Sequence, residues 1–137
     1  MSKMGCPCGG IISDVVCPSP TEGWLFREQD EETFSAIICR DIAAFFAAVH
    51  SGQRETWIRQ FFPDPYPTDV DDEGMVSDII AFHARTVRLS ICECAKCGRL
   101  HVQRSNGVNS YIRYSPDESG YKGVLRSQTA TGLLHTD

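Results

Sequence analysis

The spacing of hydrophobic and polar positions predicts a long amphipathic helix in the first half of the chain. Between residues 31 and 49, apolar side chains recur mostly at steps of three and four, which is typical of a helix with one buried face. Asp30 is the expected N-terminal cap, and Gly52 the expected C-terminal stop. The apolar positions are Phe34, Ile37, Ile38, Ile42, Phe45, Phe46 and Val49.

Two shorter helices are predicted after it. Residues 53–62 carry apolar side chains at helical spacing, and Pro63 ends that segment because proline cannot donate a backbone hydrogen bond. Residues 71–84 open with an acidic turn and continue with apolar residues at helical spacing. The middle of the chain is therefore expected to be helical.

The period then changes to two, which is typical of strands. Residues 86–92, 98–104 and 109–115 alternate between apolar and polar positions, and Ser105-Asn106-Gly107 forms a strong hairpin turn signal between the last two. Residues 10–16 and 23–30 are expected to be short and extended. The pattern as a whole predicts an α+β fold.

Two pairs of closely spaced cysteines predict a metal site. Cys94 and Cys97 form a C-x-x-C knuckle followed by Gly98, and Cys6 and Cys8 form a tighter C-x-C turn followed by glycine. A structural zinc ion takes four ligands with no open position, and each turn supplies two. We therefore expect one structural Zn²⁺ held by Cys6, Cys8, Cys94 and Cys97.

Three further cysteines are open to more than one interpretation. Cys92 repeats the C-x-C spacing with Cys94 and could replace a ligand, although strand alternation weakly favours a bystander. Cys39 lies inside the apolar helical pattern and is expected to be a small core residue. Cys17 is expected to pack or to lie in a loop.

The expected metal site and the expected helices together predict the architecture of the chain. The two chain ends form a zinc-ribbon-like β-hairpin unit, and a helical segment over about residues 31–84 is inserted between them. We expect a single zinc-stapled domain over residues 1–126 and a loose tail over residues 127–137.

Composition sets the class of protein. With 137 residues, 42% of them hydrophobic and 23% charged, the chain can bury one modest core. We expect no apolar stretch of membrane-spanning length and no secretion signal at the N-terminus. Clustered cysteines without a secretion signal favour a reducing, cytoplasmic location and no membrane partner.

The charge is distributed unevenly, which points to a binding surface. Residues 1–84 contain 14 acidic and 5 basic residues, whereas residues 85–126 contain 3 acidic and 8 basic ones. Acidic and aromatic side chains gather in a stretch rich in proline, and a basic partner protein could bind there. The candidate partner-binding residues are Asp64, Tyr66, Asp69, Asp71, Asp72 and Glu73.

No pattern in the sequence indicates catalysis. The four histidines are scattered, and the chain contains no H-E-x-x-H, G-x-S-x-G, P-loop or dinucleotide-binding motif. His83 is expected to be a partly buried helix residue rather than a catalytic base. We therefore expect no enzymatic activity.

The motifs at the two ends resemble those of a group of small bacterial proteins. "CPCG" followed by "ISD", the "REQD" that opens the helical insert, and "CAKCGRL" are similar to those of proteins with a single zinc site formed by both chain ends. Such small acidic proteins resemble immunity proteins encoded beside polymorphic or secretion-system toxins. The resemblance implies a chain that binds a cognate toxin, such as a nuclease, and blocks its active site.

A second class of function stays open. A zinc ribbon could bind nucleic acid or a transcription complex through its basic residues, which are Arg88, Lys96, Arg99, Arg104 and Arg113. The net charge of −5 and the absence of a lysine-rich run make nucleic acid the less expected partner. An adaptor that binds another protein is the third possibility.

Overall fold

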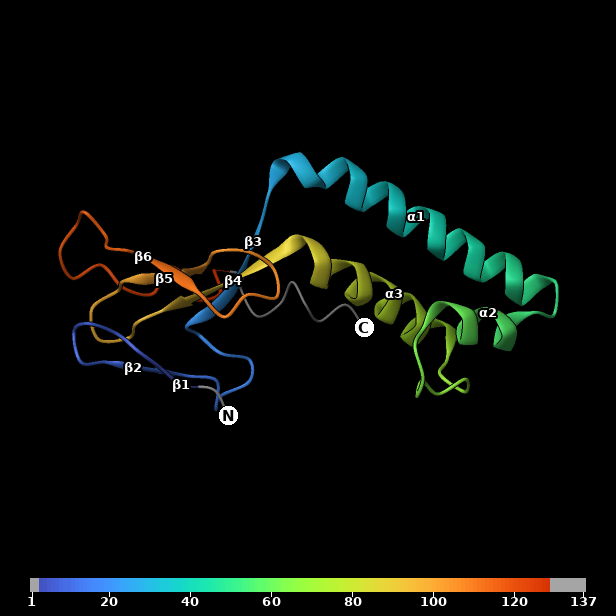
Figure 1. Ribbon diagram of the computed structural model, residues 1–137, viewed down its shortest axis with the longest axis horizontal. Helices are drawn as coiled ribbons and strands as arrows, with labels where there is room; N and C mark the ends of the chain where they lie inside the picture. The colour runs from blue at the N-terminus through green and yellow to red at the C-terminus, as the bar shows by residue number, and fades with distance from the viewer. Residues whose placement is uncertain (1–2, 129–137) are drawn as a thin grey trace. The chain divides into compact units, whose positions relative to one another are not determined.

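The computed structural model describes residues 3–128 and confirms the α+β fold (Figure 1). The chain divides into two compact units. Unit 1 combines both chain ends, Met1–Leu25 and Leu89–Asp137, and unit 2 is the continuous segment Phe26–Arg88. The predicted helical insert lies within unit 2.

Unit 1 contains two antiparallel sheets. Strands β1 (Lys3–Gly5) and β2 (Ile11–Ser13) form a two-stranded hairpin. The second sheet has the order β3-β4-β5-β6, with bounds Glu22–Phe26, Arg88–Glu93, Leu100–Gln103 and Tyr111–Tyr114. Because β4, β5 and β6 pair as consecutive antiparallel neighbours, they form a meander in which each turn joins adjacent strands.

The predicted strands are confirmed, with two differences in detail. Helix α3 continues to Val87, so β4 begins at Arg88 and not at Thr86. Gly107 has φ +75°, which confirms the turn signal. The connection is nevertheless longer than a tight hairpin, since the N–H of Arg104 bonds to the carbonyl of Ser110 at 2.8 Å.

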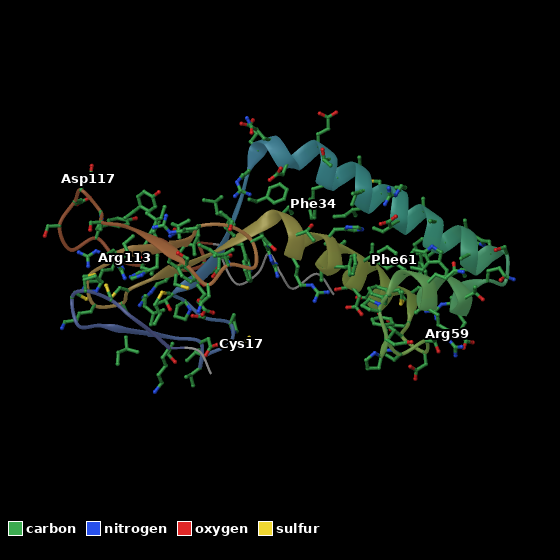
Figure 2. All side chains as sticks on the ribbon, viewed as in Figure 1. Cys17, Phe34, Arg59, Phe61, Arg113 and Asp117 are labelled. Carbon is green, nitrogen blue, oxygen red and sulfur yellow. The ribbon has the colours of Figure 1, made fainter. Side chains whose placement is uncertain are left out.

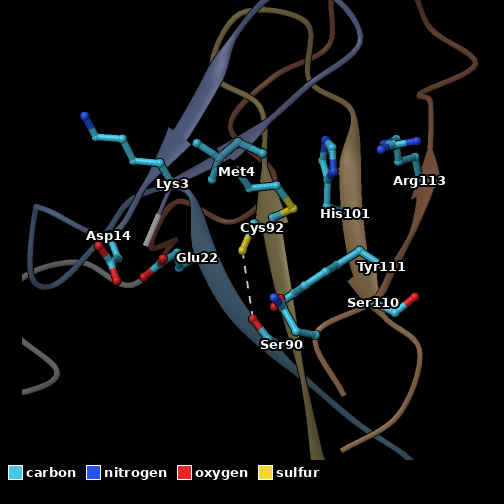
Figure 3. A pocket seen from close by; sticks show the side chains of 12 residues that line it. Lys3, Met4, Asp14, Glu22, Ser90, Cys92, His101, Ser110, Tyr111 and Arg113 are labelled. Carbon is cyan, nitrogen blue, oxygen red and sulfur yellow. Dashed lines mark hydrogen bonds between the residues drawn. The ribbon is translucent and has the colours of Figure 1, made fainter. Parts of the chain in front are cut away.

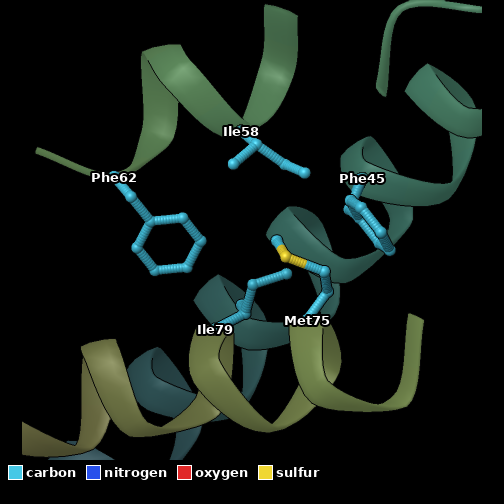
Figure 4. Packing of buried hydrophobic residues seen from close by; sticks show 5 residues of the cluster. All are labelled: Phe45, Ile58, Phe62, Met75 and Ile79. Atoms are coloured by element: carbon cyan, nitrogen blue, oxygen red, sulfur yellow. The ribbon is translucent and has the colours of Figure 1, made fainter. Parts of the chain in front are cut away.

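Unit 2 is built from three helices around one apolar core. Helices α1 (Glu28–His50), α2 (Arg54–Phe61) and α3 (Asp72–Val87) follow one another, and α1 packs against both of the others. The helical periodicity of the sequence therefore located all three elements. The fully packed residues are Phe45, Ile58, Phe62, Met75 and Ile79 (Figure 4).

The start of α1 differs from the prediction, whereas its end does not. Asp30 lies inside the first turn, and the residue that precedes the helix, Arg27, makes no side-chain capping hydrogen bond. Carboxylates in the first turn interact favourably with the helix dipole, which allows α1 to begin earlier. At the other end, Gly52 adopts φ +73° and its N–H bonds to the carbonyl of Val49.

Two expectations about α1 are wrong. Cys39 is exposed and is not a core residue. Among the described residues, α1 is also long and apolar enough, by length and composition alone, to cross a membrane. The core helix of a soluble protein and a signal sequence near the N-terminus pass the same test, and 17% of the apolar stretch of α1 is buried. Cys17 is exposed in the loop between β2 and β3 (Figure 2).

A buried aspartate–histidine pair joins α1 to α3. Asp41 is 7% exposed, and its Oδ2 lies 2.6 Å from Nε2 of His83. Arg40 donates from Nε to Oδ1 of the same carboxylate at 3.0 Å. Burial would raise the pKa of Asp41, but the hydrogen bonds from Arg40 and His83 outweigh it and hold the pKa below its usual value.

Replacing Asp41 with asparagine should destabilise unit 2. The change leaves His83 without its charged partner, and we expect the free energy of unfolding at pH 7 to fall by about 1–3 kcal/mol. The pKa of Asp41 is lower in the folded state than in the unfolded state, so the carboxylate stabilises the fold above about pH 4. This stabilisation is lost as the pH falls through the folded-state pKa. Urea denaturation at pH 7 and at acid pH measures both effects.

Asp30→Asn is the matched control for this prediction. Asp30 forms an exposed pair with Arg27 at 3.6 Å, and its loss should cost less than about 0.5 kcal/mol. Equal destabilisation by the two variants would contradict a structural role for the buried pair.

Candidate metal centre

The first pair of cysteines lies on the turn between β1 and β2. The N–H of Cys6 bonds to the carbonyl of Gly10 at 2.8 Å, and the N–H of Gly9 bonds to the carbonyl of Cys6 at 2.9 Å. Gly9 adopts φ +88°, a conformation that residues with a side chain rarely adopt. These bonds close the chain into a tight turn with both thiols on it.

The second pair lies on the turn between β4 and β5. The N–H of Cys94 bonds to the carbonyl of Arg99 at 2.9 Å, and the N–H of Gly98 bonds to the carbonyl of Cys94 at 2.8 Å. Gly98 adopts φ +77°. Gly98, which directly follows the C-x-x-C motif, therefore turns the backbone at the end of the knuckle.

The two turns bring all four thiols together. The Sγ atoms of Cys6, Cys8, Cys94 and Cys97 lie within 4.8 Å of one another. Cys6 lies 3.6 Å from Cys97, and Cys8 lies 3.5 Å from Cys94. A tetrahedral ion with metal–sulfur bonds of about 2.3 Å separates its sulfurs by about 3.8 Å. The four cysteines therefore form a possible metal site of tetrahedral size.

Backbone and basic groups surround the thiols. The N–H of Gly10 donates to Sγ of Cys8 at 3.4 Å, and the guanidinium of Arg99 donates to Sγ of Cys6 at 3.6 Å. Gly10 has no space for a side chain, since a Cβ there would lie 2.7 Å from Sγ of Cys94. Donors of this kind stabilise thiolates, as metal ligation requires.

The pKa values of Cys6 and Cys97 are shifted in opposite directions. Burial would raise the pKa of Cys6, but hydrogen bonds from the Cys8 backbone and the neighbouring groups lower it to about 5. The backbone at Arg99 favours the thiolate of Cys97, yet burial and the adjacent thiols raise its pKa to about 11. A metal that binds all four as thiolates must therefore displace protons, so its affinity rises with pH.

Cys92 lies outside this group of four. It is buried on β4, where its Sγ lies 3.9 Å from Oγ of Ser90. Burial raises the pKa of the Cys92 thiol, and the nearby carboxylate of Glu22 adds to this effect. The geometry supports the interpretation of Cys92 as a bystander, because a neutral buried thiol packs as a small apolar side chain.

One residue beside the knuckle was not identified from the sequence. Glu93 is 3% exposed, and its two carboxylate oxygens accept the N–H groups of Gly123 and Val124 at 2.8 and 3.1 Å. A Cβ on Gly98 would overlap the carbonyl oxygen of Tyr121. The segment before residue 127 is therefore attached to the knuckle. The predicted tail of 127–137 falls largely outside the described residues.

The acidic stretch of unit 2 contains both structural and exposed carboxylates. Asp71 caps α3 by accepting the N–H of Gly74 at 2.7 Å, and Asp72 pairs with Arg54 at 3.3 Å. Asp64 and Asp69 instead line an open hollow of about 700 Å³. Glu73 is exposed in the first turn of α3.

Tyr66 has a structural role in the same stretch. Its hydroxyl donates to Oδ2 of Asp78 at 2.5 Å, and its ring stacks on Phe62 with centroids 4.0 Å apart. Burial and the adjacent carboxylate raise the pKa of Tyr66 to about 12. The ring also lines the hollow beside Asp64. It therefore fixes the shape of the loop at the proposed partner surface.

Two of the basic residues considered for nucleic-acid binding are engaged in unit 1. Besides its contact with Cys6, Arg99 donates from Nε to Ser115 at 3.1 Å, and Lys96 donates to the carbonyl of Cys8 at 3.1 Å. Arg104 and Arg113 are exposed. Two of the five basic side chains therefore hydrogen bond within the possible metal site.

The family of the chain is established by comparison. A family model described as "Domain of unknown function (DUF8617)" matches residues 2–118, and the chain belongs to this family. Searches of curated proteins and of solved structures found no match.

Replacing one ligand should empty the metal site. We expect the purified protein to contain one metal ion per chain and Cys97→Ser to contain none, with a loss of about 3 kcal/mol or more in the unfolding free energy. Elemental analysis and thermal melting measure both quantities. A Cys97→Ser variant that keeps stoichiometric metal and its melting temperature would show that the ligands are misassigned.

Two substitutions, compared with each other, test whether Cys92 or Cys94 is a metal ligand. Cys92→Ser should retain the metal, because Cys92 is not one of the clustered thiols, whereas Cys94→Ser should lose it. Metal content of the two variants, measured side by side, decides between them. If Cys92→Ser loses the metal and Cys94→Ser keeps it, then Cys92 and not Cys94 is the ligand.

Proposed function

We propose that the chain is a non-enzymatic binding protein with a structural zinc ion, and that it neutralises a basic protein partner, namely a bacterial toxin. The partner would bind the acidic surface of unit 2, which we define as Asp64, Asp69 and Glu73. The proposal combines the closed metal site with carboxylates that have no evident structural role.

Zinc is the metal that this site fits best. Four thiolates fill a tetrahedral coordination sphere and leave no position for water or substrate, which is typical of structural zinc. Iron accepts the same ligands, but short knuckles closed by glycine are the common form of zinc ribbons. In this proposal the ion stabilises unit 1 and takes no part in chemistry.

The exposed carboxylates are the observation that carries the binding proposal. All five carboxylates are exposed, but Asp71 and Asp72 are used by the fold, which leaves Asp64, Asp69 and Glu73 as the candidates for contact with a partner. Pro65 and Pro67 restrict the backbone between them, so the surface loses little conformational freedom when a partner binds. A rigid acidic surface of this kind complements a basic protein.

Toxin neutralisation explains why the surface would be acidic. A nuclease needs a cationic cleft for its nucleic-acid substrate, and an acidic protein can occupy that cleft in place of the phosphates. Long-range attraction between the two also speeds association, which favours rapid neutralisation. The resemblance of such small acidic proteins to immunity proteins points to the same class of partner.

The nucleic-acid alternative has less support. Arg99 and Lys96 hydrogen bond at the metal centre, which leaves fewer basic side chains of unit 1 to contact phosphates. The chain as a whole carries a net charge of −5, which repels a polyanion.

Charge reversal tests the binding surface. The triple variant Asp64→Lys, Asp69→Lys, Glu73→Lys should lower the association rate with the toxin encoded by the adjacent gene by about tenfold at low salt. The loss should shrink as salt is added, because screening acts over about 8 Å at physiological ionic strength. Stopped-flow kinetics and rescue from toxicity on co-expression measure the effect.

The control carries the same change of charge elsewhere in unit 2. Glu28→Lys, Glu31→Lys and Glu32→Lys lie in the first turns of α1, away from the acidic loop in sequence. Both triple variants should keep the metal. If the control variant loses association as strongly, the effect is one of net charge alone, and the acidic surface is not the binding site.

A further inference from the structure

Unit 1 contains a cavity that the metal centre does not explain. It has a volume of about 540 Å³, and the residues that line it come from both sheets of unit 1 (Figure 3). Pockets that bind small molecules commonly measure about 300–1,000 Å³. The cavity is therefore large enough for a small organic ligand.

The floor of the cavity is a row of side chains that crosses the four-stranded sheet. Cys92 on β4 pairs with His101 on β5, and His101 pairs with Arg113 on β6, so these three share one face. Glu22 contributes from β3, the opposite edge strand. Strands lie about 4.8 Å apart, so β3 and β6 are separated by about 14 Å.

His101 is the feature that points to a ligand. Its side chain is 0% exposed, and neither ring nitrogen has a hydrogen-bond partner among the residues that the structure describes. The ring lies against Cys6 and contributes to the lowered pKa of that thiol, although the contact does not meet the geometry of a hydrogen bond. Buried polar groups are nearly always paired, since water has been removed from them at a cost. His101 lines the cavity, and a bound polar group there would supply a partner.

The charges around the cavity select the class of ligand. Asp14, Glu22 and Lys3 lie on one side of Cys92 and His101 and together carry one net negative charge, whereas Arg113 lies on the other side (Figure 3). An anion alone would meet the net negative side, and a cation alone would meet Arg113. A ligand with an ammonium group at one end and a carboxylate at the other meets an opposite charge at both ends.

The same side chains do not suggest a second metal site. Within residues 3–128, the only group of histidine, cysteine and carboxylate ligands close enough to hold an ion is the four-cysteine cluster. The imidazole of His101 is therefore better matched by a hydrogen-bonding organic group.

We propose that this cavity binds a short zwitterionic peptide of about three residues. Such a peptide is about 10 Å long when extended, and the side chains of Glu22 and Arg113 reach inward from strands about 14 Å apart. Its ammonium group pairs with Glu22, its carboxylate pairs with Arg113, and a peptide group in the middle hydrogen bonds to His101. Met4 and Ile12 form an apolar wall for its side chains. This inference does not depend on the proposed function.

Trialanine is the probe that tests the charge pattern. Isothermal titration calorimetry on the metal-loaded full chain at pH 7 should detect binding of trialanine, and blocking either end by N-acetylation or C-amidation should weaken it about tenfold. 8-Aminooctanoate carries both charges at a comparable separation but no peptide group. It should bind more weakly than trialanine, because it leaves His101 unpaired.

Two substitutions on opposite edges of the sheet locate the binding site. Glu22→Gln and Arg113→Gln should each weaken trialanine binding about tenfold, and Arg104→Gln and Glu118→Gln, which are exposed and do not line the cavity, should leave it unchanged. Metal content and melting temperature verify that each variant is folded. Nitrogen-15 NMR of the unmodified protein should also show a shift of the His101 ring signals on addition of trialanine.

Three results would overturn the proposal. The first is no detectable binding of trialanine at millimolar concentration, together with unchanged His101 signals. The second is equal affinity for trialanine and its end-blocked forms. The third is binding that both Glu22→Gln and Arg113→Gln leave unchanged, which would place the peptide elsewhere on the chain.

Discussion

The approach of four thiols from the two ends of the chain is the constraint on which unit 1 depends. The inner two cysteines, Cys8 and Cys94, are separated by 85 residues, yet their sulfurs lie 3.5 Å apart. Holding chain ends together across such a loop costs conformational entropy, and four negative sulfurs would repel one another without a cation. A metal ion bound by the four cysteines would offset both costs, and the turns that carry these cysteines belong to both sheets of unit 1.

Local sequence signals predicted the parts of this arrangement that depend on neighbouring residues. The glycine after the C-x-x-C motif, the Ser105-Asn106-Gly107 turn and the apolar periodicity of all three helices each lie where the pattern indicated. The four-cysteine group was also predictable, because two short cysteine turns in one chain supply the four ligands that a tetrahedral metal ion requires.

The remaining features depend on contacts between distant segments, which carry no local signal. Asp41 lies within an apolar helical pattern and looks like an exposed residue until His83 of α3 is placed beside it. Glu93 and the segment at Gly123 are 30 residues apart, and His101 alternates normally within its strand. Cys39 was expected to be buried and is exposed. A helical pattern alone does not fix how far round the helix the buried face extends.

The discontinuity of unit 1 has a consequence for the order in which the protein is made. Unit 2 is one unbroken segment, so its three helices can pack as soon as it leaves the ribosome. The Cys6 and Cys8 turn is synthesised first but must wait for the chain to reach Cys97 before a full set of ligands exists. During that interval two adjacent thiols stand open to oxidation, so a metal bound at this site would have to arrive after Cys97 is made and while both thiols are still reduced.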